Sequence, residues 1–368
     1  MSDVSMGALD AALAPYRHRS NHEIEARLAQ YEAARGKTDY PSAGTMRANR
    51  ALFGGGKRYR YAVACLTYQG LTGSAGFERP AGPATWLELY HLYTLFLDDI
   101  MDEDERRRTV PSAWLANGRA YRGRDARHPA RLFRSVRHRY GASMAILDAL
   151  RIRSLAERAI QGAVQVEVAS REQLLQLLTE TDLRLSDGQG LDIDLESLPR
   201  VPESDYERMS ELKTGVLYVA AAETGAILAG ATPARARGVG EFARRFSIAF
   251  QDRDDLLGSG VVRSRIGGSR EGDIAQGKRT RLFAIATAGM PASERKRFLG
   301  SYGKGTRTTA EDVRFVREAF REHALARMME RIEENVSAAV EALRRSTPAE
   351  PYGSTLQALA RAQLTRES

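Results

Sequence analysis

The stretch FLDDIMDEDERRR, residues 96–108, contains six carboxylates within eight positions, followed at once by three arginines. Neighbouring carboxylates repel one another unless they are well solvated or a cation lies among them. If residues 86–105 form a helix, Asp98 and Asp102 lie one turn apart on the same face. Two carboxylates placed this way can share a hard cation such as Mg²⁺, which commonly brings substrate phosphate with it. Arg107 and Arg108 suit the same phosphate, because guanidinium binds it bidentately.

A second acidic group, in FQDRDDLLG (residues 250–258), follows another apolar helical stretch and contains Asp252, Asp254 and Asp255. Either group alone is also typical of a solvated helix face. Two groups about 150 residues apart, each ending an apolar helix of one bundle, favour several metal ions around a single polyanion.

Helical periodicity dominates the chain, and no run of alternating residues indicates a strand. Residues 204–230 are predicted to be helical from a capping box of Ser204 and Glu207, and residues 308–345 from Thr308 and Glu311. Glycine and proline gather in three segments that we interpret as loops within one domain: 70–84, 109–129 and 258–272. The prediction is a single all-α domain over residues 1–368, in which residues 1–40 form an N-terminal helical extension.

The composition, with 43% hydrophobic and 28% charged residues, is that of a soluble globular protein. A single cysteine, Cys65, excludes internal disulfides and favours the cytoplasm. The first twenty residues lack the apolar run of a signal peptide. The most apolar later stretch, residues 215–231, is interrupted by Glu223, so we expect a buried helix and no stable membrane insertion.

The net charge of +8 is unevenly placed, since Arg106 to Arg139 contain eleven arginines and one acid, Asp125. A nucleic-acid partner and a solvated basic loop are both consistent with such a segment. Aromatic side chains that could stack on bases are sparse there, so we do not expect nucleic acid.

The motifs resemble those of the trans-type isoprenyl diphosphate synthases, in the same order along most of the chain. GGGKRYR (54–60) is similar to the family's first basic motif, and ELYHLYTLFLDDIMD with ERRR is similar to its first aspartate-rich helix. The later markers are DGQGLDID (187–194), LKTG (212–215), FQDRDD and GDIAQGKRT (272–280). The resemblance implies an all-α bundle around a deep central cavity, usually in a homodimer. It also implies condensation of an allylic diphosphate with isopentenyl diphosphate.

The resemblance implies a role for each motif residue. Those expected to ligate up to three Mg²⁺ ions are Asp98, Asp102 and Asp254. Those expected to hold the allylic diphosphate are Arg107, Lys213 and Lys278. Those expected to bind isopentenyl diphosphate are Lys57, Arg60, His91 and Arg108. Thr214 and Gln251 would face the allylic cation and complete the catalytic set.

Product length is expected to depend on the helix that carries Asp98. Tyr93 and Tyr90 precede Asp98 by five and eight residues, so a rise of about 1.5 Å per residue places them one to two turns away. Either ring could end the tunnel for the growing chain, or both could pack in the core. In the family, an aromatic residue five positions upstream suggests a short product, here the twenty-carbon or the fifteen-carbon diphosphate.

The chain also departs from the family pattern. Gly258 replaces a third aspartate, Gly268 replaces a lysine, and Ala149–Leu150 stands where a Gly-Asp pair is expected. These departures favour a catalytically degenerate partner subunit as one alternative, and a terpene cyclase on the same scaffold is another. The first basic motif argues against a cyclase, which has no use for an isopentenyl diphosphate pocket.

Overall fold

The computed structural model describes residues 6–35, 41–107, 109–127, 132–198, 200–262 and 272–367. The first helices are α1 (Met6–Arg35), α2 (Pro41–Ala48), α3 (Arg50–Phe53), α4 (Tyr59–Thr72), α5 (Glu78–Met101), α6 (Ala113–Arg119), α7 (Val136–Gln161) and α8 (Val168–Glu196). The later helices are α9 (Glu203–Ser210), α10 (Val216–Leu228), α11 (Pro233–Gly258), α12 (Gly272–Gln276), α13 (Arg281–Gly289), α14 (Ala292–Ser301), α15 (Ala310–His323), α16 (Leu325–Arg345) and α17 (Tyr352–Arg361).

Three short helical turns and one small hairpin complete the described elements. The turns are η1 (Glu211–Gly215), η2 (Gly305–Arg307) and η3 (Ala362–Leu364), and the strands are β1 (Arg106–Arg107) and β2 (Val110–Pro111). The two strands pair antiparallel. The prediction of an all-α fold is therefore confirmed for the described residues, with this hairpin as the departure.

The chain divides into two compact units, which are described separately here. The α5 unit comprises Leu13–Cys65 and Gly76–Leu175, and the α11 unit comprises the described parts of Met1–Ala12, Leu66–Ala75 and Gln176–Ser368. The expectation of a single functional domain stays a prediction.

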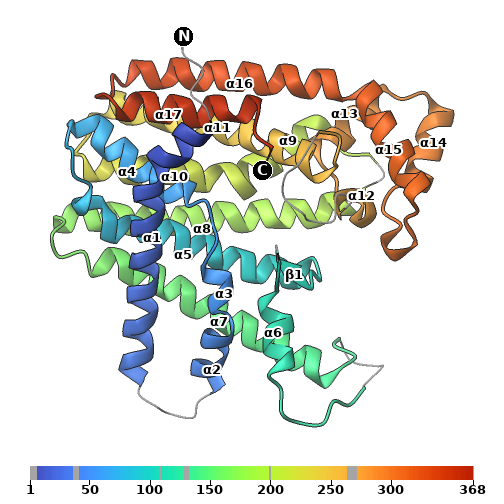
Figure 1. The fold of residues 1–368 in the computed structure, drawn as a ribbon, viewed down its shortest axis with the longest axis horizontal. Coiled ribbons are helices and arrows are strands. Elements are labelled where there is room, and N and C mark those ends of the chain that lie inside the picture. Colours follow the sequence, from blue (N-terminus) through green and yellow to red (C-terminus); the bar gives the residue numbers. More distant parts are fainter. Residues whose placement is uncertain are drawn as a thin grey trace. The chain divides into compact units, whose positions relative to one another are not determined.

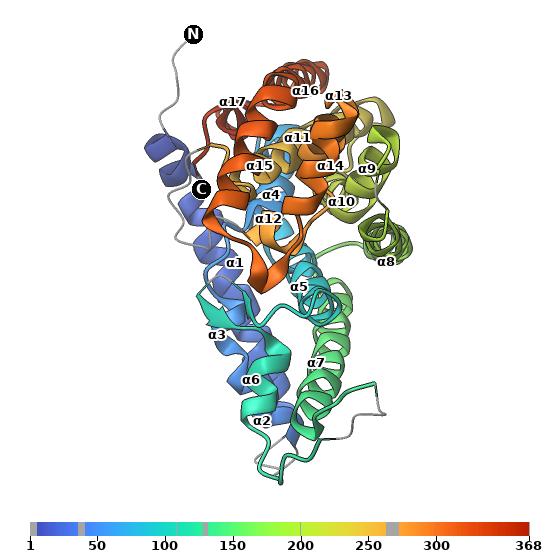
Figure 2. The ribbon, with the colours of Figure 1, turned by 90° about the vertical axis from the view of Figure 1, so that its right-hand side faces the viewer.

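In the α11 unit, α16 runs along α11, and α10 packs against α11 as well (Figures 1 and 2). Thr232 caps the start of α11 and Pro233 occupies its first turn, where a missing backbone N–H costs nothing. The rings of Phe242 and Phe246 stack on this helix, 6.1 Å apart, and both are buried. The last two turns of α11 carry the second aspartate group, so this core fixes its backbone.

In the α5 unit, α5 packs against α7, and α6 packs against α7 (Figure 1). Helix α5 is apolar around most of its circumference, as expected for a helix surrounded by others. Trp86 and Tyr90 are fully buried, with ring centroids 6.0 Å apart. This burial anchors α5, whose C-terminal end carries the first aspartate group.

Two predicted helix starts are wrong by one or two residues. Helix α9 follows Pro202 as its N-cap, and the Ser204 hydroxyl donates to the Asp205 carboxylate instead of capping the helix. Helix α15 has a capping box, but Thr309 and Asp312 form it. The predicted helix 308–345 is also divided, because Ala324 (φ −136°) separates α15 from α16.

The glycine- and proline-rich segments are only partly loops. Helix α5 begins at Glu78 and includes Pro83, and α6 lies inside the segment 109–129. Pro80, the third residue of α5, is tolerated because the first N–H groups of a helix have no intrahelical partner, whereas Pro83, the sixth residue, removes one backbone hydrogen bond. Among the described helices, none combines the length and hydropathy needed to cross a membrane.

Candidate active-site residues

The first aspartate group lies at the C-terminal end of α5. The Asp102 N–H donates to the Asp98 carbonyl across 2.8 Å, so the two residues are one helical turn apart, as predicted. Both side chains are partly exposed, whereas Asp99 between them is buried. Asp98 and Asp102 therefore present their carboxylates on one face, and Asp99 points into the protein.

Arg107 on β1 reaches back to this group. Its Nε donates to Asp99 Oδ1 at 2.8 Å and its Nη2 to Asp98 Oδ2 at 3.1 Å. Burial raises the pKa of the Asp99 carboxyl to about 6, against the opposing effect of the Arg107 hydrogen bond. The Trp114 indole donates to the Asp99 and Asp104 carbonyls and fixes the turn between α5 and β1. The structure thus brings together Asp98, Asp102 and Arg107.

The first basic motif is tied to α5 through Glu88. Arg58 forms a buried ion pair with Glu88 at 3.4 Å, and the Tyr61 N–H donates to Glu88 Oε1 at 3.1 Å. Lys57 and Arg60, both partly exposed, flank Arg58 in sequence. His91 lies three residues after Glu88, on the same side of α5. The contacts therefore attach the basic motif to α5 within one turn of His91, and Arg108 lies outside the described residues.

Tyr90 and Tyr93 differ in exposure. Tyr90 is fully buried, whereas Tyr93 is partly exposed, and their ring centroids are 5.1 Å apart in an edge-to-face arrangement. Tyr90 is therefore a core residue with Tyr93 packed against it, and Tyr93 is the ring with a face outside the core.

In the α11 unit, Lys213 and Thr214 lie on η1, a π-helical turn between α9 and α10. The Val216 N–H donates to the Glu211 carbonyl five residues earlier, which is the π-helical pattern. Gly188 on α8 lies so close that a Cβ there would be 2.5 Å from the Lys213 backbone nitrogen. The marker DGQGLDID thus supplies the glycine that admits this turn and also Asp192, which pairs with the Lys213 ammonium.

Gln251 on α11 connects Thr214 with the second aspartate group. The Thr214 hydroxyl donates to Gln251 Oε1 at 2.9 Å, and Gln251 Nε2 donates to Asp255 Oδ1 at 3.0 Å. Asp255 Oδ2 accepts from the Tyr206 hydroxyl at 2.7 Å and from the backbone N–H of Arg281 at 3.0 Å. Burial raises the pKa of Asp255 to about 7, and these hydrogen bonds oppose that effect. None of the sequence motifs indicated this role for the Tyr206 hydroxyl.

Asp254, the second predicted metal ligand on α11, is 43% exposed and pairs with Arg366 near the C-terminus. The Arg366 guanidinium also lies 4.3 Å from the centroid of the Phe250 ring. The backbone carbonyl of Arg366 accepts from Arg253 Nε at 2.7 Å. No motif indicated Arg366, which joins Asp254 from 112 residues away.

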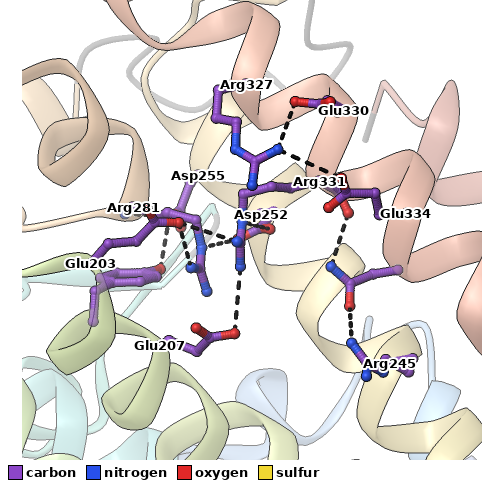
Figure 3. Close-up of polar contacts among 12 residues, drawn as sticks. Glu203, Glu207, Arg245, Asp252, Asp255, Arg281, Arg327, Glu330, Arg331 and Glu334 are labelled. Atoms are coloured by element: carbon purple, nitrogen blue, oxygen red, sulfur yellow. Dashed lines mark hydrogen bonds and ion pairs between the residues drawn. The ribbon is translucent and has the colours of Figure 1, made fainter. Parts of the chain in front are cut away.

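A buried ion-pair network holds the remaining aspartate of this group (Figure 3). Arg281 Nε donates to Asp252 Oδ1 at 2.7 Å, and Arg331 Nε lies 3.8 Å from Asp252 Oδ2. Arg331 also reaches Glu203 at 3.2 Å and Glu207 at 3.5 Å. The network ties α11 to α9, α13 and α16, so it stabilises the end of α11 that carries Asp254.

The marker GDIAQGKRT places three further residues. Thr280 caps α13, and Arg281 is therefore the first residue of that helix, with an N–H that needs an outside acceptor. The Lys278 carbonyl accepts from the Tyr302 hydroxyl, which fixes the backbone beside the predicted diphosphate ligand. The Asp273 carboxylate lies directly over Gly258, in contact with the position of a Cβ there. Gly268 lies outside the described residues.

On α7, Ala149 and Leu150 stand where the family pattern has a Gly-Asp pair. Ala149 is buried and Leu150 is exposed, but Asp148 directly before them is fully buried. Asp148 accepts hydrogen bonds from Thr45, Asn49 and Arg151. The helix therefore does contain a buried, hydrogen-bonded aspartate at this point.

Both aspartate groups offer carboxylate oxygens, which are the ligands that Mg²⁺ prefers. Asp98, Asp102 and Asp254 each keep part of their side chain exposed. Asp99, Asp252 and Asp255 are buried and bound by protein donors. The accessible members are the three that the sequence predicted, and their chemistry fits a hard divalent cation.

Comparison with known proteins places the chain in a family. The polyprenyl synthetase family model matches residues 45–320. A geranylgeranyl diphosphate synthase of Methanosarcina mazei is 33% identical over 263 residues, 72% of this chain and 71% of that protein. The solved geranylgeranyl pyrophosphate synthetase of Pyrococcus horikoshii Ot3 has a TM-score of 0.79 at 25% identity, over 98% of both chains.

A second solved structure extends the likeness of fold. The geranylgeranyl pyrophosphate synthase of Corynebacterium glutamicum, complexed with isoprenyl diphosphate and magnesium, has a TM-score of 0.82 at 23% identity. The match covers 95% of this chain and 98% of that one. With its helices, aspartate groups and basic motifs in the family's order, the chain belongs to the polyprenyl synthetase family, whose members are trans-isoprenyl diphosphate synthases and thus prenyltransferases.

Proposed function

We propose that the protein condenses an allylic diphosphate with isopentenyl diphosphate in a Mg²⁺-dependent reaction and releases pyrophosphate. The observation that carries the proposal is the division of each aspartate group into buried and accessible members. Asp99 and Asp255 are buried, whereas Asp98, Asp102 and Asp254 keep part of their side chains exposed, although Arg107 and Arg366 contact Asp98 and Asp254. An acidic face that is only solvated would not need some of its aspartates buried and others exposed.

Asp98, Asp102 and Asp254 are the proposed ligands of up to three Mg²⁺ ions. Bound Mg²⁺ would neutralise the charge that develops on the departing pyrophosphate. Arg107, Lys213 and Lys278 are proposed to hold the same diphosphate. Arg107 is paired with Asp98 and Asp99, and Lys213 with Asp192. These cations are therefore preoriented by carboxylates and can bind phosphate oxygens without a large loss of side-chain entropy.

Isopentenyl diphosphate is proposed to bind Lys57, Arg60, His91 and Arg108. The Arg58–Glu88 ion pair supports this assignment, because it attaches the basic motif next to His91 on α5. Thr214 and Gln251 are proposed to face the allylic cation. Their mutual hydrogen bond supports a shared task, since it brings together two side-chain oxygens from η1 and α11.

The proposed product is the twenty-carbon diphosphate, with the fifteen-carbon diphosphate as the alternative. The relative from Methanosarcina mazei, a geranylgeranyl diphosphate synthase, supports the longer one. Tyr93 is proposed as the residue that ends the tunnel for the growing chain, with Tyr90 behind it. The partial exposure of Tyr93 beside the buried Tyr90 supports this order.

The protein is further proposed to be a cytoplasmic homodimer. Helix α7 exposes Ile146, Leu147 and Leu150, at 40%, 44% and 51%, on adjoining turns, and such a patch suits a second copy of the chain. The single cysteine, Cys65, is buried and unpaired with another cysteine, which suits a reducing compartment. Sedimentation of the wild type and of Leu147→Glu tests the dimer; a monomeric wild type would contradict it.

The decisive experiment incubates the purified chain with Mg²⁺, labelled isopentenyl diphosphate and each allylic primer in turn. Extension of at least one primer is expected, with a labelled alcohol of twenty carbons after dephosphorylation. Cyclised hydrocarbon formed without isopentenyl diphosphate would favour the cyclase. If neither a labelled alcohol nor a cyclised hydrocarbon forms, the result would favour the degenerate partner subunit.

A further inference from the structure

A chain of hydrogen bonds runs from η1 to α9 through the second aspartate group. It begins at the Thr214 hydroxyl, passes through the Gln251 amide and the Asp255 carboxylate, and ends at the Tyr206 hydroxyl. The heavy-atom distances are 2.9, 3.0 and 2.7 Å, each within the range of a well-formed bond. Helix α9 and η1, which are consecutive in sequence, are therefore both joined to α11, from 49 and 37 residues away.

The inner half of this chain is closed to solvent. Tyr206 is 2% exposed and Asp255 is 3% exposed. Burial and the neighbouring Asp255 raise the pKa of Tyr206 well above its usual value, so the phenol stays protonated. The Arg281 N–H, the second donor to the same oxygen, can only donate. Asp255 Oδ2 therefore has two fixed donors, and the carboxylate cannot turn away from Gln251.

This fixed carboxylate determines which way the Gln251 amide faces. Asp255 Oδ1, as an acceptor, requires the NH₂ end of the amide, and Gln251 must then present its carbonyl to Thr214. The Thr214 hydroxyl therefore donates its hydrogen to the Gln251 carbonyl. Its oxygen lone pairs can then favour positive charge placed beside them.

We propose that Tyr206 is a positioning residue for the condensation, acting through Asp255 and Gln251 to hold the Thr214 oxygen toward the allylic cation. The proposal rests on the prenyltransferase function proposed above and adds to it a residue outside the motifs. Packing alone does not require the hydroxyl, because a phenylalanine ring would fill the same space and keep the contact with Arg281, whose guanidinium lies 5.1 Å from the ring centroid.

Tyr206→Phe removes the hydroxyl and keeps the ring. We expect kcat to fall about 10- to 100-fold, the effect of losing one hydrogen bond to a charged group. The KM values of both diphosphates should stay within about twofold, because the hydroxyl acts on the cation and not on either diphosphate. Unchanged kcat, or a KM rise that accounts for the whole loss, would overturn the proposal.

Thr287→Val is the matched control. Thr287 on α13 is also buried in the α11 unit, and its hydroxyl donates to the Phe283 carbonyl, away from the chain of bonds. The control should lose thermal stability about as Tyr206→Phe does, yet keep its kcat within about twofold. A control that loses kcat equally would show that any buried hydroxyl of this unit matters, and would overturn the proposal.

A double-mutant cycle tests whether Tyr206 acts through Gln251. In the background of Gln251→Met, which cannot bond Asp255 or Thr214, Tyr206→Phe should lower kcat by no more than about twofold further. If the loss of kcat in the double variant equals the product of the two single losses, the residues act independently and the proposal is overturned. If Tyr206→Phe does not fold, Asp255→Asn replaces it: the Asn amide can turn its NH₂ toward Gln251 and invert the bonds as far as Thr214, so kcat should fall with both KM values kept.

Failure of this inference differs from failure of the proposed function. A wild-type chain that extends no primer refutes both. An active wild type with an equally active Tyr206→Phe refutes only the role of Tyr206.

Discussion

Arg281 Nε donates to Asp252 Oδ1 across 2.7 Å, and neither side chain has any access to solvent (Figure 3). Such a pair loses its hydration on folding and recovers that cost only while both partners are present. Arg331 Nε, 3.8 Å from the other Asp252 oxygen, is the next nearest cation. The end of α11 therefore depends on a contact that sequence spacing did not indicate.

Arg281→Met should lower the free energy of unfolding by about 3–5 kcal/mol, because it leaves the Asp252 carboxylate buried without its main partner. The double variant Asp252→Leu with Arg281→Met should recover most of that loss. Urea denaturation measures both. Arg327→Ala, which removes an exposed pair with Glu330, is the control and should change stability by about 0.5 kcal/mol or less. A single variant as stable as this control would contradict the expectation.

Asp102→Ala should reduce turnover by about 10³-fold or more, since several kcal/mol of charge stabilisation depend on the metal ligands. Its thermal midpoint should equal or exceed that of the wild type, because a partly exposed carboxylate beside other acids adds repulsion. Asp98→Ala should lose turnover equally, with a small stability loss from its contact with Arg107. Glu105→Ala, an exposed acid nearby, should remain active. A variant of Asp102 that keeps most of its turnover in Mg²⁺ would mean that the group is a solvated face.

Arg60→Ala should raise the KM for isopentenyl diphosphate by about tenfold and leave the KM for the allylic primer nearly unchanged. Lys213→Ala should do the reverse, because Lys213 is assigned to the ionising diphosphate. Steady-state kinetics with each substrate varied separately measures both. Equal effects on the two KM values would show that the two pockets are assigned wrongly.

Tyr93→Ala should lengthen the product by at least one five-carbon unit, since it removes the ring proposed to end the tunnel. The further change Tyr90→Ala should lengthen it again, but Tyr90 is fully buried and its loss should cost about 3–5 kcal/mol. The double variant is therefore best assayed at low temperature. Chromatography of the dephosphorylated alcohols gives the chain length, and an unchanged distribution in both variants would place the end of the tunnel elsewhere.

Thr309→Ala should cost about 1 kcal/mol of stability, because the Thr309 hydroxyl accepts from the Asp312 N–H and caps α15. The neighbouring Thr308→Ala is the matched control and should cost a few tenths of a kcal/mol at most, since Thr308 lies outside the cap. Thermal denaturation compares the two. Equal losses would argue against the cap seen in the structure.

The sequence predicted those site residues whose relationship is local. Asp98 and Asp102 are related by helical periodicity alone, and hydrophobic patterning was enough to predict the helices around them. The exact start of a helix was harder to predict. Thr308 and Thr309 are chemically identical neighbours, and only the folded backbone shows that Thr309 is the N-cap of α15. The π-helical turn likewise left no pattern, since it inserts a single residue into an otherwise helical stretch.

The missed residues are those whose partners are distant in sequence. The hydroxyl of Tyr206 meets Asp255 from 49 positions away, and Arg366 meets Asp254 from 112. A buried tyrosine fits a helical core equally well with or without a partner for its oxygen. Only the folded arrangement of α9 beside α11 distinguishes a packing ring from a hydrogen-bond donor.

Gly258 has a consequence for how this chain could be changed. The Asp273 carboxylate already occupies the space into which a side chain at 258 would extend. An aspartate at this position would therefore require the Asp273 side chain to move. It would also bring two like charges close together. A side chain at position 258 is therefore best introduced together with a smaller, neutral residue at position 273.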